Sequence, residues 1–157
     1  METIFNKNKK GFSLIELIIV LAIISILTSI IITGLSSFNR KEALEKDTQV
    51  VVDMLRQARS QTLASHNASQ YGVYFATSSI TLFTGTTYSA VSSSNNVYTF
   101  NPQVSISNIG LTSSSTSIVF SRLSGEASHT GTITLLSPAT SSPKTVTIYA
   151  TGLVESN

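Results

Sequence analysis

The sequence predicts an α+β fold in which a long N-terminal helix packs on an antiparallel β-sheet or a two-sheet β body formed by the C-terminal part. Two patterns predict it. Up to about residue 65 there is no proline, and the only glycine after Gly11 is Gly34. Beyond that point, short runs of alternating β-branched or aromatic residues are separated by Gly, Pro, Asn and Ser. We therefore expect one nearly continuous helix over residues 13–65, followed by strands.

The first part of the predicted helix has the character of a membrane span. No charged residue occurs from Leu17 to Phe38, and most residues there are Leu, Ile, Val or Ala. As a helix this stretch extends about 30 Å, the thickness of one bilayer core. Residues 12–38 are accordingly predicted to form a transmembrane and assembly segment.

The second part of the helix, residues 39–66, is predicted to be amphipathic. Charges of both signs are dense between Arg40 and Arg59. Apolar or small residues recur at intervals of three, four and seven, which places them on one face of a helix. These residues are Leu44, Val51, Leu55, Ala58 and Thr62. We expect this face to pack on the β body.

Residues 67–157 are predicted to form a β-rich domain. In residues 145–149, for example, Val146 and Ile148 point to one face while threonines point to the other, so that threonine replaces charge on the solvated side. The serine-rich stretches 92–94, 113–117 and 140–142 are predicted loops. The predicted strands are Gln70–Ala76, Ser79–Phe83, Val97–Phe100, Val104–Ser107, Ser117–Ser121, Thr132–Leu136 and Thr145–Tyr149.

Charge and composition exclude several function classes. The net charge of +2 comes entirely from the first eleven residues, which contain Lys7, Lys9 and Lys10. A surface that follows nucleic-acid phosphates needs several Lys or Arg, and the β-rich domain offers only Arg122 and Lys144. Nucleic acid is therefore not an expected partner.

No motif predicts an enzyme. The chain has no cysteine, which excludes thiol catalysis and thiolate metal sites. His66 and His129 do not have metal-ligand spacing. Residues 141–144 formally match the S-x-x-K pattern, but Pro143 and the Ser/Thr-rich surroundings indicate a loop. We expect no catalytic residue, cofactor, metal or small-molecule substrate.

The N-terminal segment carries the strongest functional signal. Lys9-Lys10-Gly11-Phe12 precedes Ser13-Leu14-Ile15-Glu16-Leu17, so a basic leader and an aromatic residue are followed by one acid in an otherwise apolar helix. An acid inside a membrane is costly and needs a functional reason and a partner. Glu16 is therefore a candidate functional residue.

These residues resemble the N-terminal signature of type IV pilins and type II secretion pseudopilins. The resemblance implies that residues 1–11 are a prepilin leader, that a prepilin peptidase cleaves between Gly11 and Phe12, and that Phe12 is N-methylated. Glu16 would set the filament register by pairing with the terminal amine of a neighbouring subunit, an attraction that is strong at low dielectric. The implied partners are the peptidase, other (pseudo)pilin subunits, an inner-membrane assembly platform and membrane lipid.

The resemblance also implies topology: a single-pass protein of the bacterial inner membrane with a cytoplasmic N-terminus and an extracytoplasmic β domain, later assembled into a pilus or pseudopilus. The flanking charges do not decide the orientation, because Arg40, Lys41 and Lys46 follow the apolar run just as lysines precede it. A secretory signal peptide is the competing interpretation of the N-terminus, and Glu16 argues against it.

The C-terminal part resembles the GspH/FimT-type minor pseudopilins more softly. Arg56, Ala58 and Arg59 match an "LR.AR..A" helix, with Ala64 two residues beyond the place of its last alanine, and Gly125, Gly131 and Gly152 recur in the downstream pattern. The lack of a disulfide pair favours a pseudopilin or minor pilin. Two alternatives stay open: a minor pilin that acts as an adhesin or DNA-uptake module, and a single-pass membrane protein with a β ectodomain and no filament role.

Overall fold

The chain forms two compact units in a computed structural model. The structure describes residues 11–138 and 143–157, and for residues 30–37 the backbone alone. The units are Met1–Ser36 and Ser37–Asn157, which we call unit 1 and unit 2. The predicted loop at 140–142 and the basic residues Lys7, Lys9 and Lys10 lie outside the described residues.

Helix α1 spans Leu14–Leu63 and belongs to both units. It begins and ends within two residues of the predicted helix, because neither a proline nor a helix-ending glycine interrupts the sequence. The helix ends just before Ser65, whose backbone is left-handed (φ 49°). Among the described residues, no helix carries an apolar stretch long enough to cross a membrane.

The β part of unit 2 is built from antiparallel strands, which confirms the predicted α+β fold class. In the described residues they form two sheets, with the order β3-β2-β1-β5 in sheet A and β4-β6-β7-β8 in sheet B. The strands are β1 (Tyr71–Ala76), β2 (Ser79–Thr84), β3 (Asn96–Thr99), β4 (Ser105–Leu111), β5 (Ser117–Val119), β6 (Gly131–Leu136), β7 (Lys144–Ile148) and β8 (Val154–Ser156).

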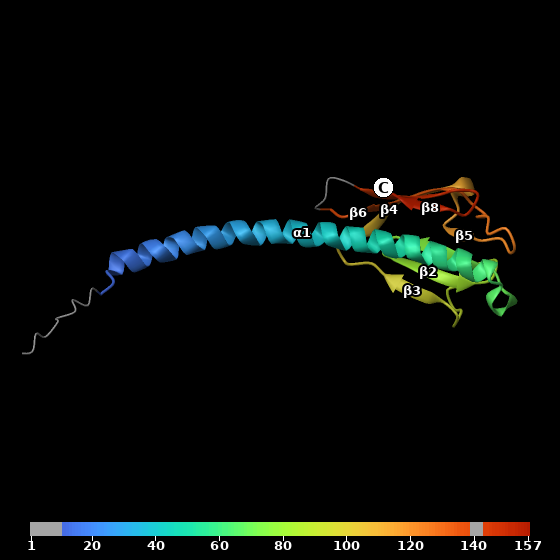
Figure 1. The fold of residues 1–157 in the computed structure, drawn as a ribbon, viewed down its shortest axis with the longest axis horizontal. Coiled ribbons are helices and arrows are strands. Elements are labelled where there is room, and N and C mark those ends of the chain that lie inside the picture. The colour runs from blue at the N-terminus through green and yellow to red at the C-terminus, as the bar shows by residue number, and fades with distance from the viewer. Residues whose placement is uncertain (1–10, 139–142) are drawn as a thin grey trace, which may run out of the picture. The chain divides into compact units, whose positions relative to one another are not determined.

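The chain alternates between the sheets. After β3 it leaves sheet A to form β4, returns for β5, and then completes sheet B. In Figure 1, strands of sheet B run along one side of the unit 2 part of α1, and β2 and β3 of sheet A run along the other. The helix and both sheets therefore share one core.

That core contains the predicted face of the helix. Its members are almost completely buried, and they cluster with inward-facing residues of both sheets such as Phe75 and Ile133. The buried helix residues of the predicted stripe are Leu44, Val51, Leu55, Ala58 and Thr62. The seven- and four-residue spacing thus predicted the packed face correctly.

Two strands differ from the sequence prediction. Strand β4 continues to Leu111, beyond the predicted end at Ser107. The register shift between Ile106 and Asn108 is a β-bulge, after which the pairing with β6 continues. Strand β8 was not predicted, because it is short and its pairing with β7 depends on the turn at Gly152.

Candidate functional site

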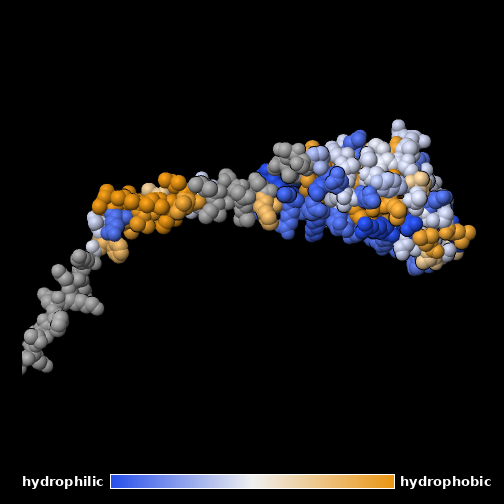
Figure 2. Space-filling view, turned by 45° about the horizontal axis from the view of Figure 1, so that its top comes forward, coloured by the Kyte–Doolittle hydropathy of each residue, from blue (hydrophilic) through white to orange (hydrophobic). Residues whose placement is uncertain are grey.

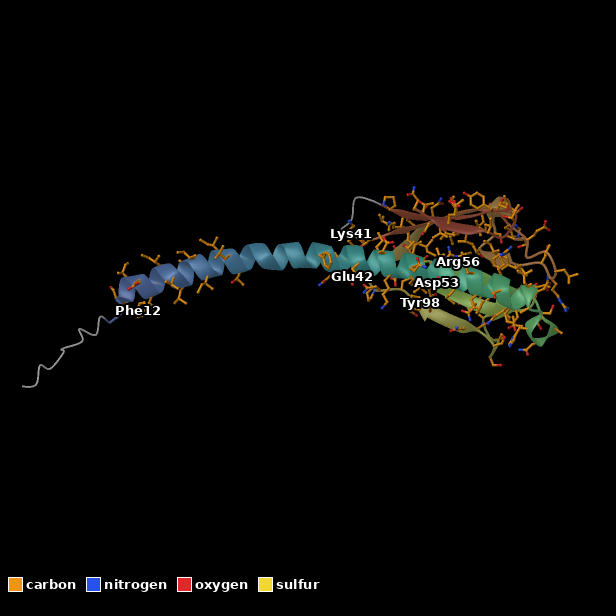
Figure 3. The ribbon with its side chains drawn as sticks, in the orientation of Figure 1. Phe12, Lys41, Glu42, Asp53, Arg56 and Tyr98 are labelled. Carbon is orange, nitrogen blue, oxygen red and sulfur yellow. The ribbon has the colours of Figure 1, made fainter. Side chains whose placement is uncertain are left out.

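The N-terminal residues that carry the signature are exposed in unit 1. Phe12 lies just before α1 (Figure 3) and is 87% exposed, while Glu16 lies in the first turn of the helix. Together with Leu17 and Val20 they line a shallow apolar depression. No ion pair to Glu16 is formed by the described residues. A partner for this carboxylate would come from outside the described residues.

The described side chains of unit 1 beyond Glu16 present a mostly apolar surface (Figure 2). Large aliphatic side chains between Leu14 and Leu27 are about half exposed or more. The hydroxyls of Ser25 and Thr28 donate hydrogen bonds to carbonyls four residues earlier, at 2.8 and 2.7 Å, so they add little polarity to the surface. A helix that is apolar around its circumference needs apolar surroundings, which lipid or other helices supply.

In unit 2, Arg59 joins the end of α1 to two loops. Its Nε donates to the Gly125 carbonyl at 3.1 Å, and its terminal nitrogen donates to the Thr151 carbonyl at 3.3 Å. We call Arg59, Gly125, Thr151 and Gly152 the Arg59 cluster. Gly125 and Gly152 are buried and have positive φ. The cluster fixes the helix to the turn before β8.

Backbone carbonyls, not an acidic neighbour on the helix, accept the hydrogen bonds of the Arg59 guanidinium. Asp53 accepts a hydrogen bond from Gln49 at 2.9 Å, an exposed contact one turn away on the helix. Arg56 is exposed, as expected for a solvated face.

A second polar link ties the helix to sheet A. Asp47 is 2% exposed, and its carboxylate accepts hydrogen bonds from the Tyr98 hydroxyl and the Asn101 backbone N–H, both at 2.8 Å. Burial, followed by the hydrogen bond and negative charge of Asp47, raises the pKa of Tyr98 above its ordinary value of 10.0. Asp47 thereby holds β3 and the loop that follows it against α1.

Lys144 and His66, which belong to the catalytic and metal patterns that the sequence did not support, have structural partners. Lys144 forms an ion pair with Glu45 at 2.9 Å, and Ser141 of the S-x-x-K match lies outside the described residues. His66 Nδ1 is hydrogen-bonded to the Tyr71 hydroxyl at 2.7 Å. Within residues 11–138 and 143–157 no cluster of three or more His, Cys, Asp or Glu is arranged to hold a metal.

Comparison with known proteins supports the N-terminal resemblance. Residues 6–32 match a family model described as the prokaryotic N-terminal methylation motif. No curated protein and no solved structure matches the chain. The motif supports a type IV pilin-like subunit, and it implies processing by a prepilin peptidase and assembly with other pilin subunits.

Sequence reasoning did not find the polar links of unit 2. Asp47 carried a detectable signal, because it falls between Leu44 and Val51 on the predicted buried face, where an acid needs partners. Arg59, Gly125 and Gly152 appeared in the GspH/FimT pattern, but nothing local indicated that they touch, because the acceptors of Arg59 are backbone carbonyls far away in the sequence.

Proposed function

We propose that this protein is a structural (pseudo)pilin subunit that assembles through the N-terminal half of α1 into a type II secretion pseudopilus or a type IV pilus. The observation that carries the proposal is the methylation motif at residues 6–32, combined with a single exposed acid, Glu16, on an otherwise apolar helix surface. Cleavage between Gly11 and Phe12 would leave Phe12 as the mature N-terminus, and N-methylation would keep its amine positively charged.

In the assembled filament, Glu16 of one subunit accepts the terminal amine of Phe12 of a neighbour. The apolar side chains around Glu16 exclude water and lower the local dielectric, which strengthens the attraction between the two charges. An unpaired carboxylate in the same surroundings would be strongly unfavourable. The pairing therefore selects one axial register between neighbouring helices.

Before assembly, residues 12–38 anchor the chain in the bacterial inner membrane, with the leader in the cytoplasm and unit 2 outside. An inner-membrane platform then receives the processed subunit. The exposed apolar surface of unit 1 supports this proposal, because it suits lipid in the stored state and other helices in the filament.

We further propose a minor subunit of the GspH/FimT type. Three of the residues on which that resemblance rests are in contact: Arg59 donates to Gly125, and Gly152 packs against both residues. Their contact supports the resemblance, because residues that matched a family pattern by chance would not be expected to lie together in the fold.

Intact-mass and N-terminal analysis of the protein from cells with and without a prepilin peptidase tests processing. We expect a mature chain that begins at methylated Phe12 only when the peptidase is present. An intact leader in cells that contain an active peptidase would refute processing and favour a single-pass membrane protein without a filament role.

The Glu16→Ala variant tests assembly. We expect normal membrane insertion but severe loss of incorporation into filaments, measured by quantifying the subunit in sheared filaments and in membranes. Glu42→Ala is the matched control, because Glu42 is also an exposed helical acid but lies in unit 2. Normal incorporation of Glu16→Ala would remove the register argument.

A further inference from the structure

Unit 2 contains a small pocket where the helix begins to pack on the β body. Its volume is about 180 Å³, and it is lined by Arg40, Pro102, Gln103, Ser137 and Pro138. These residues come from α1, from the loop after β3 and from the end of β6. Among these five residues Arg40 carries the one charge, which is positive.

Arg40 lies on α1 just before its buried part. It lies one turn before Leu44 and two turns before Asp47, both of which are buried. Its Nε is buried and has no hydrogen-bond partner among the described residues. A guanidinium nitrogen that is buried without a hydrogen-bond acceptor destabilises the folded state. An anion that accepted its hydrogen bond would therefore stabilise the fold.

A second unpartnered donor lies in the same pocket. Ser137 is completely buried, and its Oγ has no hydrogen-bond partner in the part of the chain that the structure describes. The opposite wall is held in place, because Asp47 accepts the N–H of Asn101, directly before Pro102. One wall of the pocket is thus fixed, and Arg40 and Ser137 each contribute an unpartnered donor.

We propose that this pocket binds a phosphate group. Arginine pairs with phosphate oxygens through several N–H groups, and a serine hydroxyl donates to a further oxygen. Two sources of phosphate fit: a phospholipid headgroup and a free phosphate ion. The headgroup source rests on the proposed membrane anchoring, in which the span ends at residue 38, about 3 Å of helix rise from Arg40.

Titration of the full-length protein in maltoside micelles, which lack phosphate, tests the proposal. The chain has four arginines, so ¹⁵N-arginine labelling yields few Nε–H signals, and the Arg40→Lys variant identifies that of Arg40. Inorganic phosphate, glycerophosphoglycerol as the headgroup probe, and acetate are added separately. We expect a saturable shift of the Arg40 signal with the phosphate compounds and none with acetate at equal concentration.

The two phosphate probes separate the sources. Saturation at lower concentration with glycerophosphoglycerol supports the headgroup, and saturation at lower or equal concentration with inorganic phosphate supports the free ion. An unmoved Arg40 signal, an equal response to acetate, or an equal shift of Arg56, which lies outside the pocket, would overturn the proposal.

Calorimetric titration of variants adds a matched comparison. Arg40→Lys keeps the charge but removes Nε, and we expect about tenfold weaker phosphate binding, the factor for losing one hydrogen bond to a charged group. Ser137→Ala should weaken binding about fivefold. Lys41→Gln, which removes an exposed neighbouring charge outside the pocket, should change it less than twofold; a loss as large as that of Arg40→Lys would refute the pocket.

Tyrosine fluorescence confirms that each variant keeps a folded body, since all five tyrosines lie in unit 2. The titration requires neither processing nor assembly. If the wild-type protein assembled normally but bound no phosphate, the result would therefore contradict this inference alone. The Glu16 and leader experiments test the proposed function separately.

Discussion

Replacing Gly152 by alanine should destabilise unit 2 strongly, because the added methyl group has no space in the Arg59 cluster. A Cβ at this position would lie 2.0 Å from the Gly125 carbonyl oxygen and 2.8 Å from Arg59 Nε. Ordinary contacts begin near 3.4 Å, so the turn must move by more than 1 Å. That movement breaks the hydrogen bonds that Arg59 donates to the two loops.

The size of the effect follows from two contributions. Gly152 has φ +76°, and a left-handed backbone costs an L-residue about 1–2 kcal/mol. Overpacking a close contact adds about 1–3 kcal/mol. Together they lower the free energy of unfolding by about 2–5 kcal/mol, a large share of the stability of a small domain.

Gly85 supplies the matched control. Its φ is +115°, but a Cβ there meets nothing within 4 Å, so Gly85→Ala measures backbone strain without the clash. Chemical denaturation of each full-length variant, followed by tyrosine fluorescence, gives the two losses in stability. We expect Gly152→Ala to lose at least about 1 kcal/mol more than Gly85→Ala. Equal losses would show that the Arg59 cluster is not tightly packed.

Two further predictions concern the other polar links. The pKa of Tyr98 is raised in the folded state. Its contribution to stability is therefore complete below pH 10 and is lost as the pH rises through the folded pKa. Asp47→Ala should move the pKa of Tyr98 back toward 10.0, as measured by absorbance at 295 nm. Thr62→Val should lower the free energy of unfolding by about 1–3 kcal/mol, because Thr62 Oγ1 accepts the buried Tyr71 N–H at 2.9 Å. Thr48→Val removes only a hydrogen bond to its own helix, so it should lower the free energy of unfolding by less than about 1 kcal/mol in the same denaturation assay. An unchanged Tyr98 titration, or equal costs for the two threonines, would contradict these assignments.

The helix was predictable because its signals are local. Spacing alone placed Leu44, Val51 and Leu55 on one face, and the structure buries all three. The same short-range reading found most strands within one or two residues, since alternation and turn residues act over a few positions.

What the sequence could not predict depends on contacts between distant segments. Strand β8 exists because Val154 pairs with Ile148 across the Gly152 turn, not because its residues favour a strand. Likewise, Arg59 resembled a solvated charge, and only the folded chain reveals its carbonyl acceptors. The signature around Glu16 could be recognised because its meaning lies in contiguous residues.

The alternation of the chain between the sheets has a consequence for how this body can be divided. Sheet A is completed by β5, which follows β4 of sheet B, so no cut in the chain separates one finished sheet from the other. A fragment that ends after β3 lacks an edge strand of sheet A, and a fragment that begins at β4 carries β5 without its partner β1. We therefore expect the two sheets to fold and unfold together rather than as separable halves.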